Sequence, residues 1–237
     1  MKRGLKSKIL LLFALITLLA CSRQKSNNSR TIHSSFAPEK FVPNWLSSEF
    51  KDAETLVIRG EKVKSENNFS VFSRWDKDSL YFFFKVIDTN LRAYQTKQDH
   101  PQLFLDDMVE VLIDTRNDKD SCWNIDDIVY HINLLKAKKD DRGTIQCKTN
   151  PLWDGNAGIS VQLFGTLNDT TDIDNGNLIS IGIPWSEIEQ TPASGLTMGI
   201  NFANGDNDGK GRQLFDWVGA WPMRTPHAFG DLILTNQ

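Results

Sequence analysis

Short segments with a two-residue period recur along most of this chain, and they constrain its fold more than any other feature. Residues 108–114 (MVEVLID) alternate in polarity, and residues 79–88 are rich in aromatic and β-branched side chains, which favour strands. Further strands are predicted at residues 69–74, 128–135, 159–166, 178–183, 196–202 and 231–235. Clusters of Asp, Asn, Gly and Pro separate them, and the only helical turn expected is 185–188. This pattern predicts an all-β fold, an antiparallel two-sheet β-sandwich of the jelly-roll or immunoglobulin-like type, over residues 37–237.

The N-terminal region has a different composition from the rest of the chain. Residues 1–8 carry four basic side chains and no acid, and residues 9–20 form a nearly unbroken apolar run, as in a secretory signal peptide. That run is shorter than the roughly 20 residues needed to span a bilayer. The junction at Cys21 resembles the bacterial lipobox, in which the cysteine is lipidated. We therefore expect a signal peptide at 1–20, a lipidated Cys21 and a polar tether over 21–36; the alternative is an ordinary signal with an incidental cysteine.

Charge and cysteine content narrow the compartment and the partners. The formal charge of −3 becomes −7 once the four basic residues of the signal are removed, which argues against nucleic acid as a partner because phosphate binding needs a basic surface. Contact with a membrane is expected through the lipid anchor alone, at the cell envelope and the outer membrane, with the periplasmic or surface face left open. Cys122 and Cys147 could form a disulfide or remain two buried thiols.

Several segments, taken in order, resemble the family 9 carbohydrate-binding module and its relatives in the DOMON-like superfamily. They are residues 75–81 (WDKDSLY), 86–88, 107–114 (DMVEVLID), 130–133 (YHIN), 183–185 (IPW), 198–202, 204–209 (NGDNDG) and 226–230 (PHAFG). The match extends over residues 37–235. It implies a β-sandwich that binds sugars without catalysis and that often carries calcium. Aromatic rings would stack on the apolar face of a sugar ring, and polar side chains would bond its hydroxyls.

The resemblance also implies which residues bind sugar. Phe104 takes the position of a stacking aromatic residue, and Glu110 takes that of a binding glutamate. His131 departs from the family pattern, which has arginine there, and Met223 stands in the register of a second stacking tryptophan, with Trp221 two residues away. The predicted sugar-binding residues are Phe104, Glu110, His131, Trp221 and Arg224. The expected partners are an oligosaccharide or polysaccharide and other envelope proteins of glycan uptake.

Residues 204–209 resemble the opening of a calcium-binding loop. Oxygen-bearing side chains alternate there, and glycine allows a sharp turn, which makes Asn204, Asp206 and Asp208 the candidate ligands of Ca²⁺. Phe215 occupies the twelfth position, where a bidentate glutamate is expected, so a simple Asn/Asp/Gly turn is the alternative. No other cofactor is expected.

Two further functions stay open from sequence. A glycoside hydrolase or lyase needs two carboxylates about 5 to 10 Å apart across a cleft, and no motif selects such a pair among the 30 acidic residues. A haem-binding redox module would use His131 and a methionine, but the chain has no CxxCH motif.

Overall fold

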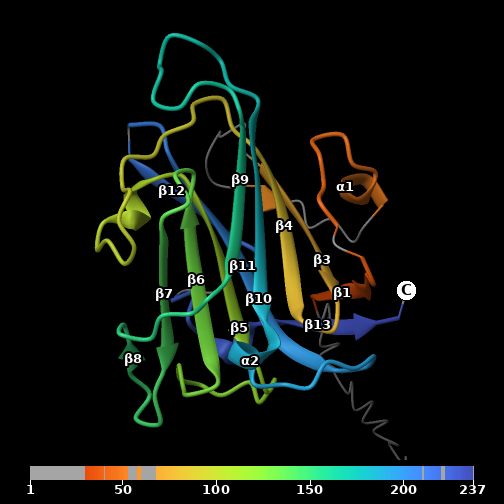
Figure 1. Cartoon of the computed structure of the whole chain (residues 1–237). Coiled ribbons are helices and arrows are strands. Elements are labelled where there is room, and N and C mark those ends of the chain that lie inside the picture. The colour runs from red at the N-terminus through yellow and green to blue at the C-terminus, as the bar shows by residue number, and fades with distance from the viewer. Residues whose placement is uncertain are drawn as a thin grey trace, which may run out of the picture.

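The computed structural model describes residues 30–39, 41–52, 58–59, 68–209, 211–219 and 222–236 (Figure 1). The predicted signal peptide, Cys21 and most of the predicted tether lie outside these residues, and so does Trp221. Among the described residues, no helix combines the length and the apolarity needed to cross a membrane.

Strands dominate the described part of the chain, and each predicted strand is confirmed. The strands are β1 (Thr31–Phe36), β2 (Ile58–Arg59), β3 (Asn68–Trp75), β4 (Ser79–Ile87), β5 (Met108–Asp114), β6 (Asp127–Asn133), β7 (Lys138–Gly143), β8 (Thr149–Asn150), β9 (Gly158–Phe164), β10 (Gly176–Pro184), β11 (Thr197–Asn207), β12 (Arg212–Asp216) and β13 (Gly230–Thr235). The helices are short: α1 (Glu49–Asp52), α2 (Trp185–Ile188) and the 3-10 turns η1 (Leu103–Leu105) and η2 (Pro226–Ala228). The predicted helical turn is therefore confirmed as α2.

The strands form one curled, mixed sheet in the order β8-β7-β6-β5-β11-β13-β1-β3-β4-β10-β9, with β12 paired to β11 and β2 to β3. Neighbouring strands are antiparallel except at β1, which runs parallel to both β13 and β3. The prediction of an antiparallel sandwich therefore holds for the other described strand pairs and fails only at β1. The prediction that the tether extends to residue 36 is also wrong, because β1 buries Ile32 and Ser34 and pairs its backbone on both sides.

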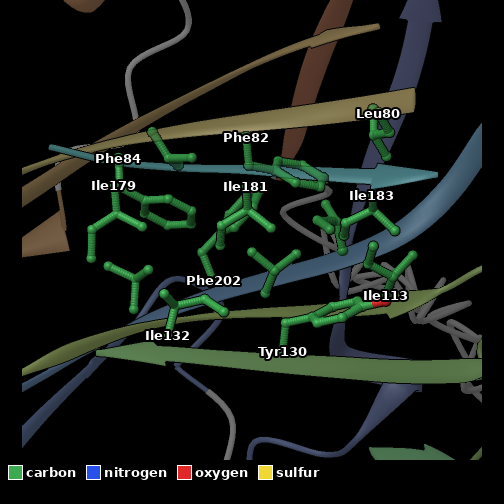
Figure 2. Packing of buried hydrophobic residues seen from close by; sticks show 14 of the residues in the cluster. Leu80, Phe82, Phe84, Ile113, Tyr130, Ile132, Ile179, Ile181, Ile183 and Phe202 are labelled. Carbon is green, nitrogen blue, oxygen red and sulfur yellow. The ribbon is translucent and has the colours of Figure 1, made fainter. Parts of the chain in front are cut away.

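The sheet curls so that its two halves pack face to face, which confirms the predicted sandwich. One half contributes β4 and β10, and the other contributes β5, β6 and β11 (Figures 1 and 2). Figure 2 shows the facing side chains Leu80, Phe82, Phe84, Ile179, Ile181, Ile183, Phe202, Ile113, Tyr130 and Ile132. Because side chains alternate along a strand, the remaining residues of each strand point away from this core.

The outer faces of the two halves differ in what they carry. On β3, β4 and β10, a second apolar cluster of Phe72, Phe83 and Leu178 is covered by Phe50 of α1 and by the segment before it. On β5, β6 and β11, the outward positions include charged and polar side chains, among them Glu110 and His131, beside small apolar clusters around Leu112 and Met108. This second face contains the candidate site.

Candidate functional site

A row of register partners forms the floor of the candidate site. Ala203 on β11 pairs with Glu110 on β5, Glu110 with His131 on β6, and His131 with Lys139 on β7. Residues paired in this way project from the same face of a sheet. The neighbours of Glu110 along β5 lie in the apolar core, so Glu110 itself projects outward, and the two-residue period of β5 decides this orientation.

Glu110 is buried beneath cationic side chains. Its Oε1 lies 3.3 Å from Nδ1 of His131 and 3.4 Å from Nη2 of Arg212. Burial alone would raise the pKa of Glu110, but His131, with further help from Arg212 and Arg224, outweighs burial and holds that pKa below its usual value. The carboxylate is therefore ionised at neutral pH and fixes the positions of the groups above it.

Arg212 reaches this site from β12. Its side chain lies against Gly205 of β11, where an added Cβ would come within 3.3 Å of Nη2 and 3.4 Å of Nε. The guanidinium carbon lies 5.7 Å from the centre of the Phe104 ring, within the range of a cation–π contact. Burial lowers the pKa of Arg212, and Glu110 opposes that shift. A side chain at position 205 would therefore crowd this guanidinium group.

Arg224 closes the opposite side of the site and is held by several partners. Its Nη1 and Nη2 donate to the two carboxylate oxygens of Asp141 at 2.7 and 2.5 Å, a two-pronged geometry that fixes the guanidinium plane. Nη1 also lies 3.2 Å from Oγ1 of Thr149, and Nη2 lies 3.5 Å from Nε2 of His131. The guanidinium carbon is 5.3 Å from the centre of the Trp123 ring.

Trp123 supports Arg224 from below and is anchored in turn. Its ring is buried with Leu112, Val129 and Phe229, so it is a packing residue of the outer face. The adjacent Cys122 forms a disulfide with Cys147, which ties this loop to the connection between β7 and β8. Of the two alternatives for the cysteines, the structure has the disulfide.

The structure brings together four of the five predicted sugar-binding residues, and Trp221 lies outside the described residues. We define the polar patch as Phe104, Glu110, His131, Arg212 and Arg224, with Asp141 beneath Arg224. Phe104 is 46% exposed and is the aromatic side chain of the patch that a ligand can reach. Sequence reasoning missed Arg212 and Asp141, because no local signal places either residue next to Glu110 or Arg224. Met223, the second of the two departures from the family pattern, packs against the cluster around Trp123.

A buried acidic cluster lies where β4 ends and β5 begins. Carboxylate oxygens of Asp88, Asp107 and Asp206 lie within 4.8 Å of one another. Asp107 accepts hydrogen bonds from the backbone N–H groups of Asn207 at 2.7 Å and Arg92 at 2.6 Å. Burial, and next the charge of Asp88, raise the pKa of Asp107 to about 9. Three buried carboxylates at this spacing fit the oxygen ligands that Ca²⁺ prefers.

This cluster contains one of the three predicted calcium ligands. Asp206 belongs to it, Asp208 is not among its three acids, and the buried Oδ1 of Asn204 has no hydrogen-bond partner among the described residues. The segment predicted as a loop continues β11 as far as Asn207 and pairs with β12, and the Asn204 amide donates to the carbonyl oxygen of Met108. The other two acids come from elsewhere in the chain, at strand ends that the curl of the sheet brings together.

A second acidic cluster lies at the opposite end of β5. Carboxylate oxygens of Asp114, Asp118 and Asp126 lie within 4.8 Å of one another. Burial, followed by the charge of Asp118 among nearby acids, raises the pKa values of the carboxyl groups of Asp114 and Asp126. Oδ2 of Asp126 is buried and has no hydrogen-bond partner among the described residues. This cluster also has the donor chemistry of a hard-cation site.

Comparison with known sequences places these features in a family context. Residues 57–237 match the model of the family described as "Carbohydrate family 9 binding domain-like". The chain is 27% identical over 169 residues to "Endo-1,4-beta-xylanase A" of Thermoanaerobacterium saccharolyticum, and 25% identical over 167 residues to "Exoglucanase XynX" of Acetivibrio thermocellus. Each alignment covers 69% of this chain but 12% and 13% of those proteins, so the chain spans about an eighth of the length of the curated relatives it matches.

Solved structures share the fold. A carbohydrate binding module of family 9 from Caldicellulosiruptor kristjanssonii, in complex with cellotriose, superposes with a TM-score of 0.65 at 18% identity, covering 87% of this chain and 94% of that one. The structure of such a module from the same organism in complex with glucose gives a TM-score of 0.65 at 19% identity, with 87% and 96% covered. At these identities the similarity establishes the architecture.

Proposed function

The chain belongs to the carbohydrate family 9 binding domain-like family, and from that premise we propose that it binds carbohydrate without acting on it chemically. The observation that carries this proposal is the convergence of Phe104, Glu110, His131 and Arg224 on one outer face of the sandwich. The sugar complexes of the structurally similar modules support it. The relationship to the wider DOMON-like superfamily stays a prediction.

The polar patch offers both kinds of contact that a sugar ring needs. The exposed ring of Phe104 can stack on the apolar face of a pyranose. The guanidinium groups of Arg212 and Arg224 can donate hydrogen bonds to the hydroxyl oxygens. Glu110 and Asp141 already hold these cations in place, so a ligand would immobilise little side-chain motion when it binds.

The contacts that the acids and His131 already make favour a binding role over a glycoside hydrolase or lyase and over a haem-binding redox module. Glu110 is buried between His131 and Arg212, and Asp141 is engaged by Arg224, whereas a hydrolase needs two carboxylates that face the substrate. The activities of the xylanase and the exoglucanase belong to proteins about eight times longer than the matched segment. His131 lies between Glu110 and Arg224, and no observation favours haem at this position.

We propose in addition that the domain is a lipoprotein held at the outer membrane. Cys21 would carry the lipid, and residues 22–30 would form a tether shorter than the sequence first suggested, since β1 begins at Thr31. The anchor would be the only contact with the membrane, and envelope proteins of glycan uptake would be the partners. The acidic mature charge argues against nucleic acid.

We propose calcium as the resident ion, with Asp88, Asp107 and Asp206 as ligands and the cluster around Asp126 as a second position. The supporting observation is that each cluster gathers three carboxylates, most of them buried, whose mutual repulsion a divalent cation would relieve. Both clusters lie at ends of β5, so a bound ion would hold the strand that carries Glu110.

Isothermal titration calorimetry tests the binding proposal. The chain beginning at residue 22 would be titrated with cello-, xylo- and manno-oligosaccharides, and we expect weak binding of at least one series. Phe104→Ala should reduce that affinity at least about fivefold, because an aromatic stacking contact is worth about 1 kcal/mol beyond its area. Phe36→Ala is the matched control, because Phe36 is 39% exposed but lies on β1 against Trp75. No heat of binding with any of the three series would overturn the proposal for neutral sugars.

A further inference from the structure

The charges of the polar patch are arranged in two layers. The side chains of Arg212 and Arg224 are 23% and 30% exposed, whereas those of their partners Glu110 and Asp141 are 2% and 3% exposed. The acids therefore lie beneath the guanidinium groups, and a ligand that approaches this face meets the cations first. The pairs balance in charge, but the accessible layer is basic on a domain whose mature charge is −7.

Lys139 extends this basic layer along β7. It projects from the same face as its register partner His131 and is partly exposed. Among the described residues it has no carboxylate within ion-pair distance, whereas the neighbouring Lys138 bonds to Asp140 at 2.7 Å and Asp154 at 2.6 Å. Lys139 is thus a cation beside the patch whose charge no acid of the described chain compensates.

The row of register partners has an acidic residue at one end and a basic residue at the other. Beyond Ala203 the row ends at Asp216 on β12, whose Oδ1 accepts the backbone N–H of Val218. Neighbouring strands are about 4.8 Å apart, so Asp216 and Lys139 are separated by four strand spacings, or about 19 Å. An anionic group on the ligand would gain most at the β6–β7 end, near Lys139 and Arg224, and least near Asp216.

Hydrogen-bonding capacity also favours an anionic ligand. Guanidinium and ammonium groups are donors only, and Nε of Arg212 has no hydrogen-bond partner among the described residues. The contact from Arg212 to Glu110 is long, at 3.4 Å, so its donors are incompletely used. A ligand carboxylate supplies acceptors and charge together, and charge-assisted hydrogen bonds are roughly twice as strong as neutral ones.

We propose that this site selects an anionic sugar, a uronic acid residue of a glycan, with its carboxylate directed toward Lys139 and Arg224. This inference rests on the proposed function, because it names the class of ligand for the same face. A sulfated sugar presents the same chemistry, so the test includes one.

The experiment compares sugars that differ only in the group at C6, which is neutral in one member of each pair and anionic in the other. Calorimetric titrations would use glucose against glucuronate, galactose against galacturonate, and glucose 6-sulfate as the sulfate arm. We expect the acidic member of each pair to bind about tenfold tighter at low ionic strength, a preference that 0.5 M NaCl should largely remove because the cations are partly exposed. Lys139→Gln should reduce the ratio of acidic to neutral affinity. Lys77→Gln, which removes the same charge from the exposed β3–β4 turn, should leave that ratio unchanged.

The outcomes separate this inference from the proposed function. Equal affinities within each pair, or a preference that Lys139→Gln leaves undiminished, would overturn the anionic-sugar site while leaving neutral sugar binding intact. Tighter binding of the sulfate than of the carboxylates would support an anion site that serves sulfated glycans. Absence of binding by every sugar, neutral and acidic, would overturn both proposals.

Discussion

The disulfide between Cys122 and Cys147 gives the most quantitative prediction. The two cysteines are 25 residues apart in sequence, and the loop they close contains all of β6 and β7. In the chain-entropy description, a cross-link over this separation restricts the unfolded chain enough to stabilise the folded state by about 3.5 kcal/mol at 25 °C. Replacing both cysteines with serine should remove that contribution without leaving a reactive thiol.

The expected result is a large fall in the melting temperature. For a domain of this size, 1 kcal/mol corresponds to about 2–4 °C, so the double variant should melt about 7–14 °C below the parent. Thermal unfolding followed by circular dichroism measures this difference. Dithiothreitol is the matched control, since it should lower the melting temperature of the parent towards that of the variant and leave the variant unchanged.

The same variant should also bind sugar less tightly. The disulfide fixes the loop of Trp123 and the segment of Thr149, and both contact Arg224. A folded double variant with weakened sugar binding is therefore expected. A melting temperature lowered by less than about 2 °C would refute the entropic reasoning, because the restriction of the unfolded chain depends only on the length of the closed loop.

Two other predictions concern ionised groups. Adding 1 mM CaCl₂ to metal-free protein should raise the melting temperature by about 5–11 °C if the dissociation constant of Ca²⁺ is a hundredfold below that concentration. Differential scanning calorimetry measures this gain, and Asp107→Asn should make it smaller. An unchanged melting temperature would contradict calcium binding. Glu110→Gln should lower the free energy of unfolding by about 2 kcal/mol at pH 7, because it leaves His131 and Arg212 without their buried anion. Since the folded-state pKa of Glu110 is depressed, its contribution is present above the unfolded value near 4.5 and is lost as pH falls through the folded pKa. Urea unfolding between pH 7 and pH 3 should therefore show a shallower acid loss in Glu110→Gln, and parallel curves would contradict this.

Most of the described strands could be predicted from sequence, but β1, β2, β7, β8 and β12 could not. β7 reads Lys-Lys-Asp-Asp-Arg-Gly, without an apolar residue to mark a core face. Its side chains are accommodated by partners that no local pattern reveals, such as Arg224 for Asp141 and Glu189 for Arg142. β1 has the polar composition of a tether. The sequence does not reveal it as a strand because its stability comes from parallel pairing with two strands that are distant in sequence.

The residues of the candidate site were likewise only partly predictable from the sequence. The motif around Glu110 and the aromatic position of Phe104 were accessible through the family resemblance. Arg212 was not, because it lies 102 residues from Glu110 and reaches it only through the pairing of β12 with β11. The acidic cluster of Asp107 likewise draws on Asp88 and Asp206, at the ends of other strands.

In strands of alternating polarity, such as β5, the sequence by itself determined which side chains face the core, because a two-residue period is a local property of an extended backbone. It therefore determined that Glu110 projects outward from β5. Only the tertiary structure decided what Glu110 meets there, since an ion pair exists at separations of about 4 Å or less, and the register and curl of the sheet set such distances between residues far apart in the chain. The basic outer layer over buried acids, and the position of Lys139 beside it, depend on the same register and curl and are therefore properties of the folded domain.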